Sequence, residues 1–341
     1  MTTLGDAGEK LFLRKLLPGL VCSDDFVNGF GHDASIVDLG FDKNIVFKID
    51  RAPNPVSVKN SWSDFCVWGR LAVVANVSDV LAVGGEAKAF MLSVIVPREM
   101  KISDLEDIIS GCADACEEFG VSFVGGDTKE GSEVQVVGAC IGVVSKEGYI
   151  GRKTAGVGDH LVVAGELGGF VGAYRYSKEN SGGEYFADAL KVMTNPVARI
   201  SEGAYMSANC VASAACDLSD GLADALSHFC DETIGVTIRE DYLPMHKFAV
   251  MTQKATRQDL YKLAFCVGDW AIAYVVTDEM YKKYIANAPS DLTLTSIGRF
   301  NGAGLKVVEL SGGACVDAPG FINEHFRARL EDASDYFDYV K

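Results

Sequence analysis

The sequence predicts two domains, an N-terminal α+β domain and a C-terminal α/β domain, from three observations. At 341 residues the chain is longer than most single domains and can bury sizeable cores. Its first half alternates β-branched runs with two long helical patterns, in the order β-α-β-α-β-β. A cluster of Gly, Lys and Thr at 146–158 then precedes a second series of strands and helices. We therefore expect domains at 1–150 and 151–320, followed by a C-terminal helix and tail at 321–341.

The stretch 71–97 organises the first domain. Its first half repeats apolar residues about once per helical turn and predicts a helix, and its second half predicts a buried strand. Asn76 and Asp79 share one face of that helix because they are three residues apart. Burying an amide or a carboxylate without a partner is costly, so both need one. This pattern alone leaves open whether the partner is a neighbouring element or a ligand.

Four other segments place an aspartate at the end of an apolar run or beside a turn-forming glycine. They are Gly31-His32-Asp33-Ala34, Lys48-Ile49-Asp50, Gly125-Gly126-Asp127-Thr128 and Asp217-Leu218-Ser219-Asp220-Gly221. Side chains at strand ends can point into a shared cleft, where carboxylates repel one another unless cations lie between them. Oxygen ligands of this kind suit Mg²⁺, which binds carboxylates together with substrate phosphates.

Two segments near these acids carry more specific expectations. Residues 121–124 are predicted to form a buried strand, with 125–128 turning away from its end. The polar, proline-bearing stretch 51–63 is predicted to be a loop.

Composition excludes several classes of function. A formal net charge of −16 argues against nucleic acid or an anionic membrane as the main partner. The ten cysteines form no CxxC pair and are interpreted as small buried hydrophobic residues. The N-terminus lacks the apolar core of a signal peptide and no apolar run is long enough to span a membrane, so we expect a cytoplasmic protein. No GxxxxGK[ST] loop occurs, so any ATP must bind in another way.

Several segments together carry a family resemblance. They are GHDASIV, LAVVANVSDVLAVGGEAKAF, FVGGDTKEG, GRKTAGVGDHLVVAGELGG, TNPVARISEG and CDLSDGLADAL. Their order resembles the aminoimidazole ribonucleotide synthetase superfamily and, within it, the thiamine-monophosphate kinases. The resemblance implies transfer of the ATP γ-phosphoryl group to thiamine monophosphate or another small metabolite. It also implies a homodimer whose N-terminal domains pair into a β-barrel, with ATP between them.

Carried over position by position, the resemblance assigns roles to twelve residues. Metal ligands would be Asp33, Asp50, Asp79, Asp127 and Asp217. Nucleotide contacts would come from Asn76, Gly125, Gly126, Thr128, Arg152 and Ser219, and Asp220, Ser219 and Arg152 would lie near the reacting phosphate. Taken singly, each has a simpler interpretation: Ser219 or Asp220 could cap a helix, Asp127-Thr128 could form a turn, and Arg152 could be a solvated surface charge.

The chain also departs from the kinase pattern. His32 stands where the family has a second carboxylate, and Ile49 where it has a hydroxyl residue. Residues 51–63 replace a His-bearing segment, and 266–271 replace GGEDYE, both near the implied acceptor pocket. ATP use is therefore better supported than the identity of the acceptor.

Two other functions remain open. The first is ATP-dependent activation of a carbonyl or amide oxygen for dehydration or ring closure, as in aminoimidazole ribonucleotide synthetase. The hydrogenase-maturation branch of that group normally carries a C-terminal cysteine, whereas this chain ends Asp338-Tyr339-Val340-Lys341. The second is a nucleotide-binding protein without catalytic activity.

Overall fold

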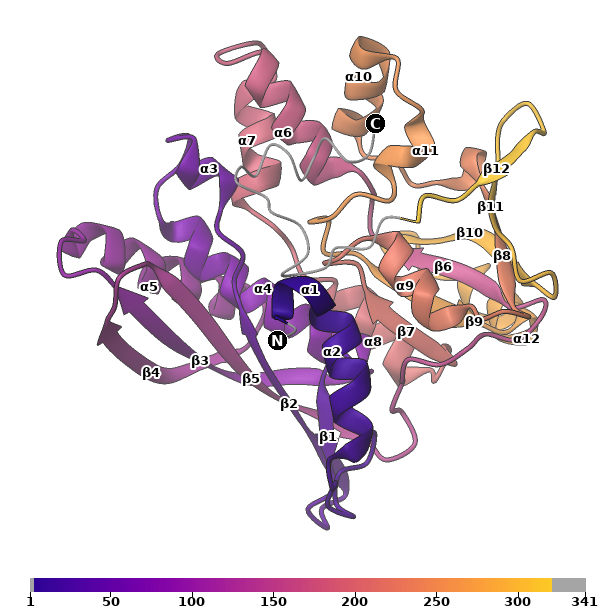
Figure 1. Cartoon of the computed structure of the whole chain (residues 1–341), viewed down its shortest axis with the longest axis horizontal. Helices are drawn as coiled ribbons and strands as arrows, with labels where there is room; N and C mark the ends of the chain where they lie inside the picture. The colour runs from indigo at the N-terminus through magenta and orange to yellow at the C-terminus, as the bar shows by residue number, and fades with distance from the viewer. Residues whose placement is uncertain (1–2, 321–341) are drawn as a thin grey trace.

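The structure, a computed structural model, describes residues 3–320 (Figure 1). The expected C-terminal helix and tail lie outside this range. Within it, the chain forms two mixed sheets with helices, as expected for an α+β fold. No helix in residues 3–320 combines the length and apolar character needed to cross a bilayer.

The first sheet has the strand order β1-β2-β5-β3-β4. Its strands are β1 (Ser35–Val37), β2 (Lys43–Arg51), β3 (Glu86–Val96), β4 (Ser122–Glu130) and β5 (Gln135–Ser145). All neighbours pair antiparallel except β3 and β4, which are parallel. Helices α4 (Cys66–Ala82) and α5 (Ile102–Glu118) lie against one face (Figure 1). The predicted order of elements in the first half is confirmed.

Helix α4 lies at the centre of the molecule. Every residue from Val67 to Ala82 is buried, including the polar side chains of Arg70, Asn76, Ser78 and Asp79 among the apolar ones. It packs on the first sheet, on α5, and on β7 (Ala214–Asp217) and α8 (Ile200–Ala208) of the second half. A Cβ on Gly69 would lie 1.8 Å from the backbone oxygen of Ile108. A Cβ on Gly111 would lie 1.9 Å from that of Cys66, so α4 and α5 cross with backbone nearly in contact.

The second sheet has the strand order β12-β11-β8-β10-β6-β9-β7. Besides β7, its strands are β6 (His160–Ala164), β8 (Gly235–Arg239), β9 (Ile272–Val276), β10 (Leu294–Asn301), β11 (Lys306–Glu309) and β12 (Cys315–Asp317). Only β8 and β11 pair in parallel, so this half is not built on the parallel sheet typical of α/β folds. The sequence analysis did not predict β8 or β12.

Helices of the second half surround this sheet. They are α6 (Gly169–Glu179), α7 (Phe186–Thr194), α9 (Leu222–Phe229), α10 (Lys247–Thr256), α11 (Leu260–Leu263), α12 (Asp278–Met280), the π-helical turn η3 (Tyr281–Ile285) and the 3₁₀ turn η2 (Glu240–Tyr242). Helices α6, α7, α10 and α11 gather beyond one end of the sheet (Figure 1).

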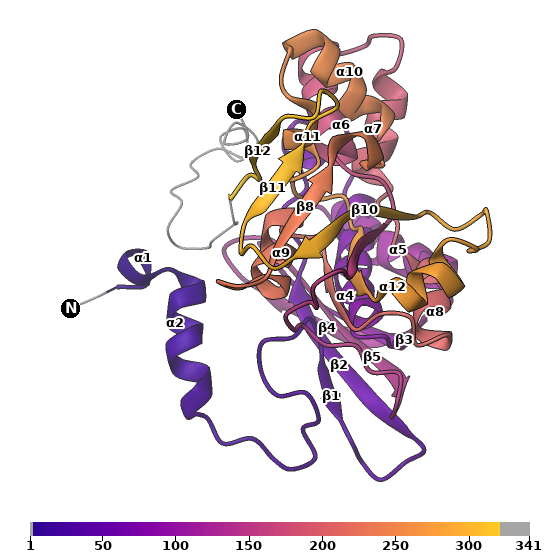
Figure 2. The ribbon, with the colours of Figure 1, turned by 90° about the vertical axis from the view of Figure 1, so that its right-hand side faces the viewer.

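The N-terminal segment runs along the outside of the molecule. It contains α1 (Leu4–Ala7), α2 (Glu9–Leu16) and the 3₁₀ turn η1 (Leu17–Gly19). Figure 2 shows α1 and α2 standing to one side of both sheets. Lys10 on α2 forms an ion pair with Asp224 on α9, which connects this segment to the second half.

Two local predictions were wrong. The stretch 51–63 is not only a loop, because it contains α3 (Val56–Lys59), with Val56 and Ser57 buried. The stretch 121–124, predicted as a short buried strand, is buried only at Val121. Strand β4 runs from Ser122 to Glu130 with every residue exposed. Phe90 of β3 pairs with Phe123 and Leu92 pairs with Gly126, so two residues of β4 lie opposite one residue of β3. The two glycines thus accommodate a bulge, with Gly125 at φ +127°, instead of a turn.

Candidate active site

Four of the five predicted metal ligands lie in one neighbourhood between the two sheets. Asp79 projects from α4, Asp50 from the end of β2 and Asp217 from the end of β7, while Asp33 precedes β1. Asp33, Asp79 and Asp217 are 4–5% exposed. The convergence of strand-end aspartates expected from the sequence is confirmed for these four.

Lys48 lies among these carboxylates. Its Nζ is 2.8 Å from Asp79 Oδ2 and 3.5 Å from Asp50 Oδ2. Although burial favours the neutral amine, Asp79 and Asp50 raise the pKa of Lys48 above its ordinary value. Burial and the neighbouring acids Asp33 and Asp50 raise the pKa of Asp79 to about 8, against the opposing effect of Lys48. Lys48 therefore donates to Asp79 as an ammonium, and the excess negative charge of the cluster favours a proton on Asp79 as long as no further cation is bound.

Arg152 is the second cation of the cluster. Its Nε donates to Asp33 Oδ2 at 3.1 Å and its Nη2 donates to Asp33 Oδ1. Its Nη1 lies 3.1 Å from Nε2 of His228, and its backbone N–H donates to Nδ1 of His32 at 3.0 Å. Arg152 is thus not a solvated surface charge, and His32 fixes the backbone that carries it.

Among the described residues, no side-chain cation contacts the carboxyl group of Asp217. Its polar partners in the described part of the chain are hydroxyl groups, Ser78 Oγ at 3.5 Å and Ser219 Oγ at 3.2 Å. Burial, with added repulsion from Asp79 and Asp33, raises the pKa of Asp217 well above its ordinary value. A buried carboxylate of this kind is where a divalent cation would bind, so the residues present fit Mg²⁺ beside Asp33, Asp79 and Asp217.

Asp127 does not join the cluster. Across the sheet, Asp50 pairs with Gly138 of β5, Gly138 with Leu92 of β3 and Leu92 with Gly126 of β4. Three interstrand steps of about 4.8 Å separate β2 from β4, or about 14 Å. Asp127 pairs with Ser93, which alternates with the buried Leu92, so Asp127 lies on the face of the sheet opposite α4. Gly125, Gly126 and Thr128 share this exposed strand.

The remaining predicted residues line the cluster. Asn76 Nδ2 donates to the backbone oxygen of Ala72 at 2.9 Å and reaches that of Asp50 at 3.5 Å. Its Oδ1 is buried with no hydrogen-bond partner among the described residues. Asp220 precedes Gly221, which is the N-cap of α9, so neither Ser219 nor Asp220 occupies the N-cap position.

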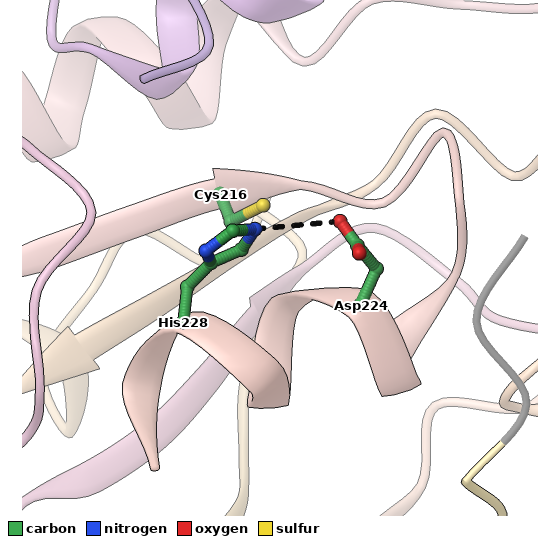
Figure 3. Close-up of side chains that lie close together, drawn as sticks. All are labelled: Cys216, Asp224 and His228. Carbon is green, nitrogen blue, oxygen red and sulfur yellow. Dashed lines mark ion pairs between the residues drawn. The ribbon is translucent and has the colours of Figure 1, made fainter. Parts of the chain in front are cut away.

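Sequence reasoning missed three side chains beside this cluster: Cys216 of β7, and Asp224 and His228 one turn apart on α9 (Figure 3). Their ligand atoms lie within 4.8 Å of one another, a donor set that Zn²⁺ accepts. Cations already occupy it, however, because Lys10 contacts Asp224 and Arg152 contacts His228. The spacing of Asp224 and His228, four apart on a helix, was the available sequence signal.

A cavity of about 490 Å³ adjoins the cluster. His32, Asp33 and Lys48 line it together with apolar side chains of the open sheet face, including Ile49, Met91 and Ile141. This volume lies in the range of small-ligand sites, and it combines an apolar wall with charged groups.

A second pocket is lined by residues of 266–271, the segment that replaces the GGEDYE of the family pattern. Asp269 is half-buried and accepts hydrogen bonds from the backbone N–H groups of Gly168 at 2.6 Å and Phe170 at 2.9 Å. Burial raises the pKa of Asp269 to about 6. Arg199 and Trp270 line the same pocket, and Nε of Arg199 is buried without a hydrogen-bond partner among the described residues.

Comparison with known proteins agrees with this geometry. Residues 31–144 match the family described as AIR synthase related protein, N-terminal domain. A thiamine-monophosphate kinase of Pyrococcus horikoshii is 30% identical over 262 residues, covering 72% of this chain and 80% of that protein. A putative hydrogenase expression/formation protein of Methanocaldococcus jannaschii is 30% identical over 217 residues, 62% of each chain.

The solved structure of AaThiL complexed with AMPPCP and TMP has the same fold, with a TM-score of 0.79. It is 24% identical, over 95% of this chain and 99% of that one. The chain therefore belongs to the AIR synthase-related family, among the ATP-dependent phosphotransferases that resemble thiamine-monophosphate kinase.

Proposed function

We propose that the protein transfers the γ-phosphoryl group of ATP to a small-molecule acceptor at the carboxylate cluster, with Mg²⁺ as cofactor. The observation that carries the proposal is the set of four converging aspartates beside a cavity of ligand size. Thiamine monophosphate is the acceptor named by the relatives, and another small metabolite remains the alternative.

In this mechanism the protein supplies positioning and charge. Asp33, Asp79 and Asp217 would hold Mg²⁺, which when bound offsets the charge of the ATP phosphates. Arg152, next to Asp33, can turn its guanidinium toward a phosphate oxygen. The hydroxyl of Ser219 now donates a hydrogen bond to Asp217. Once a cation binds Asp217, that hydroxyl can donate to the nucleotide instead. An acceptor that is already an oxyanion needs no general base, so none is assigned.

The acceptor pocket differs from the family pattern in charge. Gly268 stands in place of an acidic residue of GGEDYE, while Arg199 and Asp269 line the pocket. A cationic thiazolium ring favours acidic and aromatic contacts, so the loss of one acid weakens that preference. We therefore propose that thiamine monophosphate is a poor substrate.

We also propose that the protein acts as a homodimer through the first sheet, with 1–150 as the ATP-binding domain and 151–320 as the second domain. The edge strand β4 has no partner beyond β3 within the described residues, and the open face exposes Phe47, Ile49, Met91 and Ile141. One Mg²⁺ ion can bridge carboxylate oxygens no more than about 4 Å apart. Asp127 would therefore serve the site of a second copy.

Incubation with ATP, Mg²⁺ and a panel of acceptors, followed by mass spectrometry, tests the proposal. Phosphoryl transfer to one acceptor supports a kinase, and steady-state kinetics with thiamine monophosphate then decide the acceptor. A kcat/KM for thiamine monophosphate of about 10⁴ M⁻¹s⁻¹ or more would show that it is the substrate after all. ADP and phosphate formed with a dehydrated or cyclised product would favour the carbonyl-activating alternative. Nucleotide binding without any turnover would overturn the enzyme assignment.

A further inference from the structure

The strongest departure from a purely metal-based site is Lys48. It stands two residues before Asp50 on β2, so strand alternation puts both side chains on the face toward α4. Ile49, between them, is 70% exposed on the other face. The Lys48 side chain is only 19% exposed, and packing between the sheet and α4 holds its ammonium at the carboxylates.

The geometry leaves little room for a metal ion between Asp50 and Asp79. Mg²⁺ binds carboxylate oxygens at about 2.1 Å in a nearly octahedral shell. Lys48 Nζ already lies 2.8 Å from Asp79 Oδ2 and 3.5 Å from Asp50 Oδ2. A divalent ion shared by these two oxygens would lie almost on the ammonium, and the two cations would repel one another.

The charges of the cluster lead to the same conclusion. Its four carboxylates, Asp33, Asp50, Asp79 and Asp217, contact two side-chain cations within the described residues, Lys48 and Arg152. When all four carboxyl groups are ionised, two negative charges remain, which one divalent ion balances. The hydroxyl-lined Asp217, and not the lysine-bound edge of Asp79, is where that ion would be needed.

We infer that the ammonium of Lys48 takes the place of one divalent cation between Asp50 and Asp79. The inference rests on the proposed Mg-ATP site and adds that a lysine side chain supplies part of the positive charge that this site needs. The protein then binds fewer divalent ions than its carboxylates suggest. Replacing Lys48 with an uncharged residue should open an additional position for a metal ion. If the role of Lys48 is only structural, the replacement should open none.

A titration with Mn²⁺ tests this inference. It uses the full-length, metal-free protein without nucleotide, and electron paramagnetic resonance measures the free Mn²⁺. Wild type is compared with Lys48→Met, with Lys48→Arg, which keeps the charge, and with Lys88→Met. Lys88 is a matched control because it is 49% exposed and pairs with Glu86 outside the cluster. We expect Lys48→Met to bind one more Mn²⁺ per chain, or to bind Mn²⁺ at least ~10-fold more tightly, because ligand charge sets affinity. The two controls should match wild type.

Equal Mn²⁺ stoichiometry and affinity in Lys48→Met and wild type would overturn the inference. If Lys48→Met is unstable without metal, its melting temperature should rise with Mn²⁺ more than that of wild type, and an equal or smaller rise would also count against it. The readout is separate from the proposed function, which fails if the wild type does not bind or turn over Mg-ATP. If Mn²⁺ binding changes as expected but the wild type shows no turnover, only the kinase proposal is refuted.

Discussion

The guanidinium of Arg152 holds the carboxylate of Asp33 through Nε, at 3.1 Å from Oδ2, and through Nη2. The two residues are 119 positions apart. The family resemblance predicted Asp33 as a metal ligand and Arg152 as a nucleotide contact. Their pairing gives the buried carboxylate of Asp33, which lines the cavity, a planar cationic partner.

This pairing makes Arg152→Lys informative. Lysine keeps the positive charge but cannot donate two parallel hydrogen bonds to Asp33. We expect kcat/KM for ATP turnover to fall at least ~10-fold, a loss comparable to that of one charge-assisted hydrogen bond. Lys153→Met, at the exposed neighbouring position, should keep wild-type kinetics. Unchanged kinetics in Arg152→Lys would mean that the pairing has no part in turnover.

A second prediction concerns the crossing of α4 and α5. Gly69→Ala would place a methyl group 1.8 Å from the backbone oxygen of Ile108, which cannot move without shifting α5. We expect a loss of about 3 kcal/mol or more in the free energy of unfolding, at the upper end of the cost of overpacking. Urea unfolding measures it, with Gly312→Ala as control because a Cβ there meets nothing within 4 Å. Equal stability of the two variants would show that the helices can separate at little cost.

Asp269 predicts a pH dependence of stability. Burial raises its pKa from 3.8 to about 6, so the folded state binds this proton more tightly than the unfolded state. The stabilisation from protonation is complete below about pH 4 and is lost as pH rises through 6. Above pH 6 the folded protein bears a cost of about 3 kcal/mol, at 1.4 kcal/mol per unit.

The comparison of wild type with Asp269→Asn isolates this effect, because other carboxyl groups titrate equally in both. The stability of wild type relative to Asp269→Asn should rise as pH is lowered from 7 to 4.5, by an amount on the order of 2 kcal/mol. A difference in unfolding free energy that is independent of pH would contradict the raised pKa.

Asp127 provides a test of the proposed dimer. Asp79→Asn and Asp127→Asn homodimers should each lose at least ~100-fold in turnover, the scale of losing a preorganised electrostatic group. If Asp127 serves the site of the second copy, a mixture of the two variants forms heterodimers with one intact site. Activity should then recover to as much as about a quarter of wild type, since random mixing gives half heterodimers. No recovery, together with a monomer mass by light scattering, would refute the shared site.

The sequence predicted most of what depends on local pattern. The apolar periodicity of the first half of 71–97 predicted α4. The aspartates near strand ends, together with Asp79 on that helix, indicated the four converging carboxylates. Lys48 could have been found in the same way, since it alternates with Asp50 on one strand face. A lysine on a strand face is by itself most simply a solvated surface charge, so the local pattern did not single out Lys48.

Features set by tertiary context were not predictable in this way. The paired glycines of β4 fit a turn and a bulge equally well, and only pairing with β3 selects the bulge. The position of Asp127, far from the other acids, follows from strand order, which local pattern does not encode. The mostly antiparallel second sheet likewise depends on long-range pairing between β6, β9 and β10.

Calorimetric measurement of ATP binding tests the central claim most directly. It compares the wild type with Asp217→Asn, each with Mg²⁺ and with excess EDTA. Asp217 is the buried carboxylate whose contacts in the described residues are hydroxyl groups, so its charge should matter most when a metal ion binds. The account predicts that wild type binds ATP only with Mg²⁺ and that Asp217→Asn loses most of this metal-dependent affinity. Equal ATP affinity of the wild type in Mg²⁺ and in EDTA would contradict it.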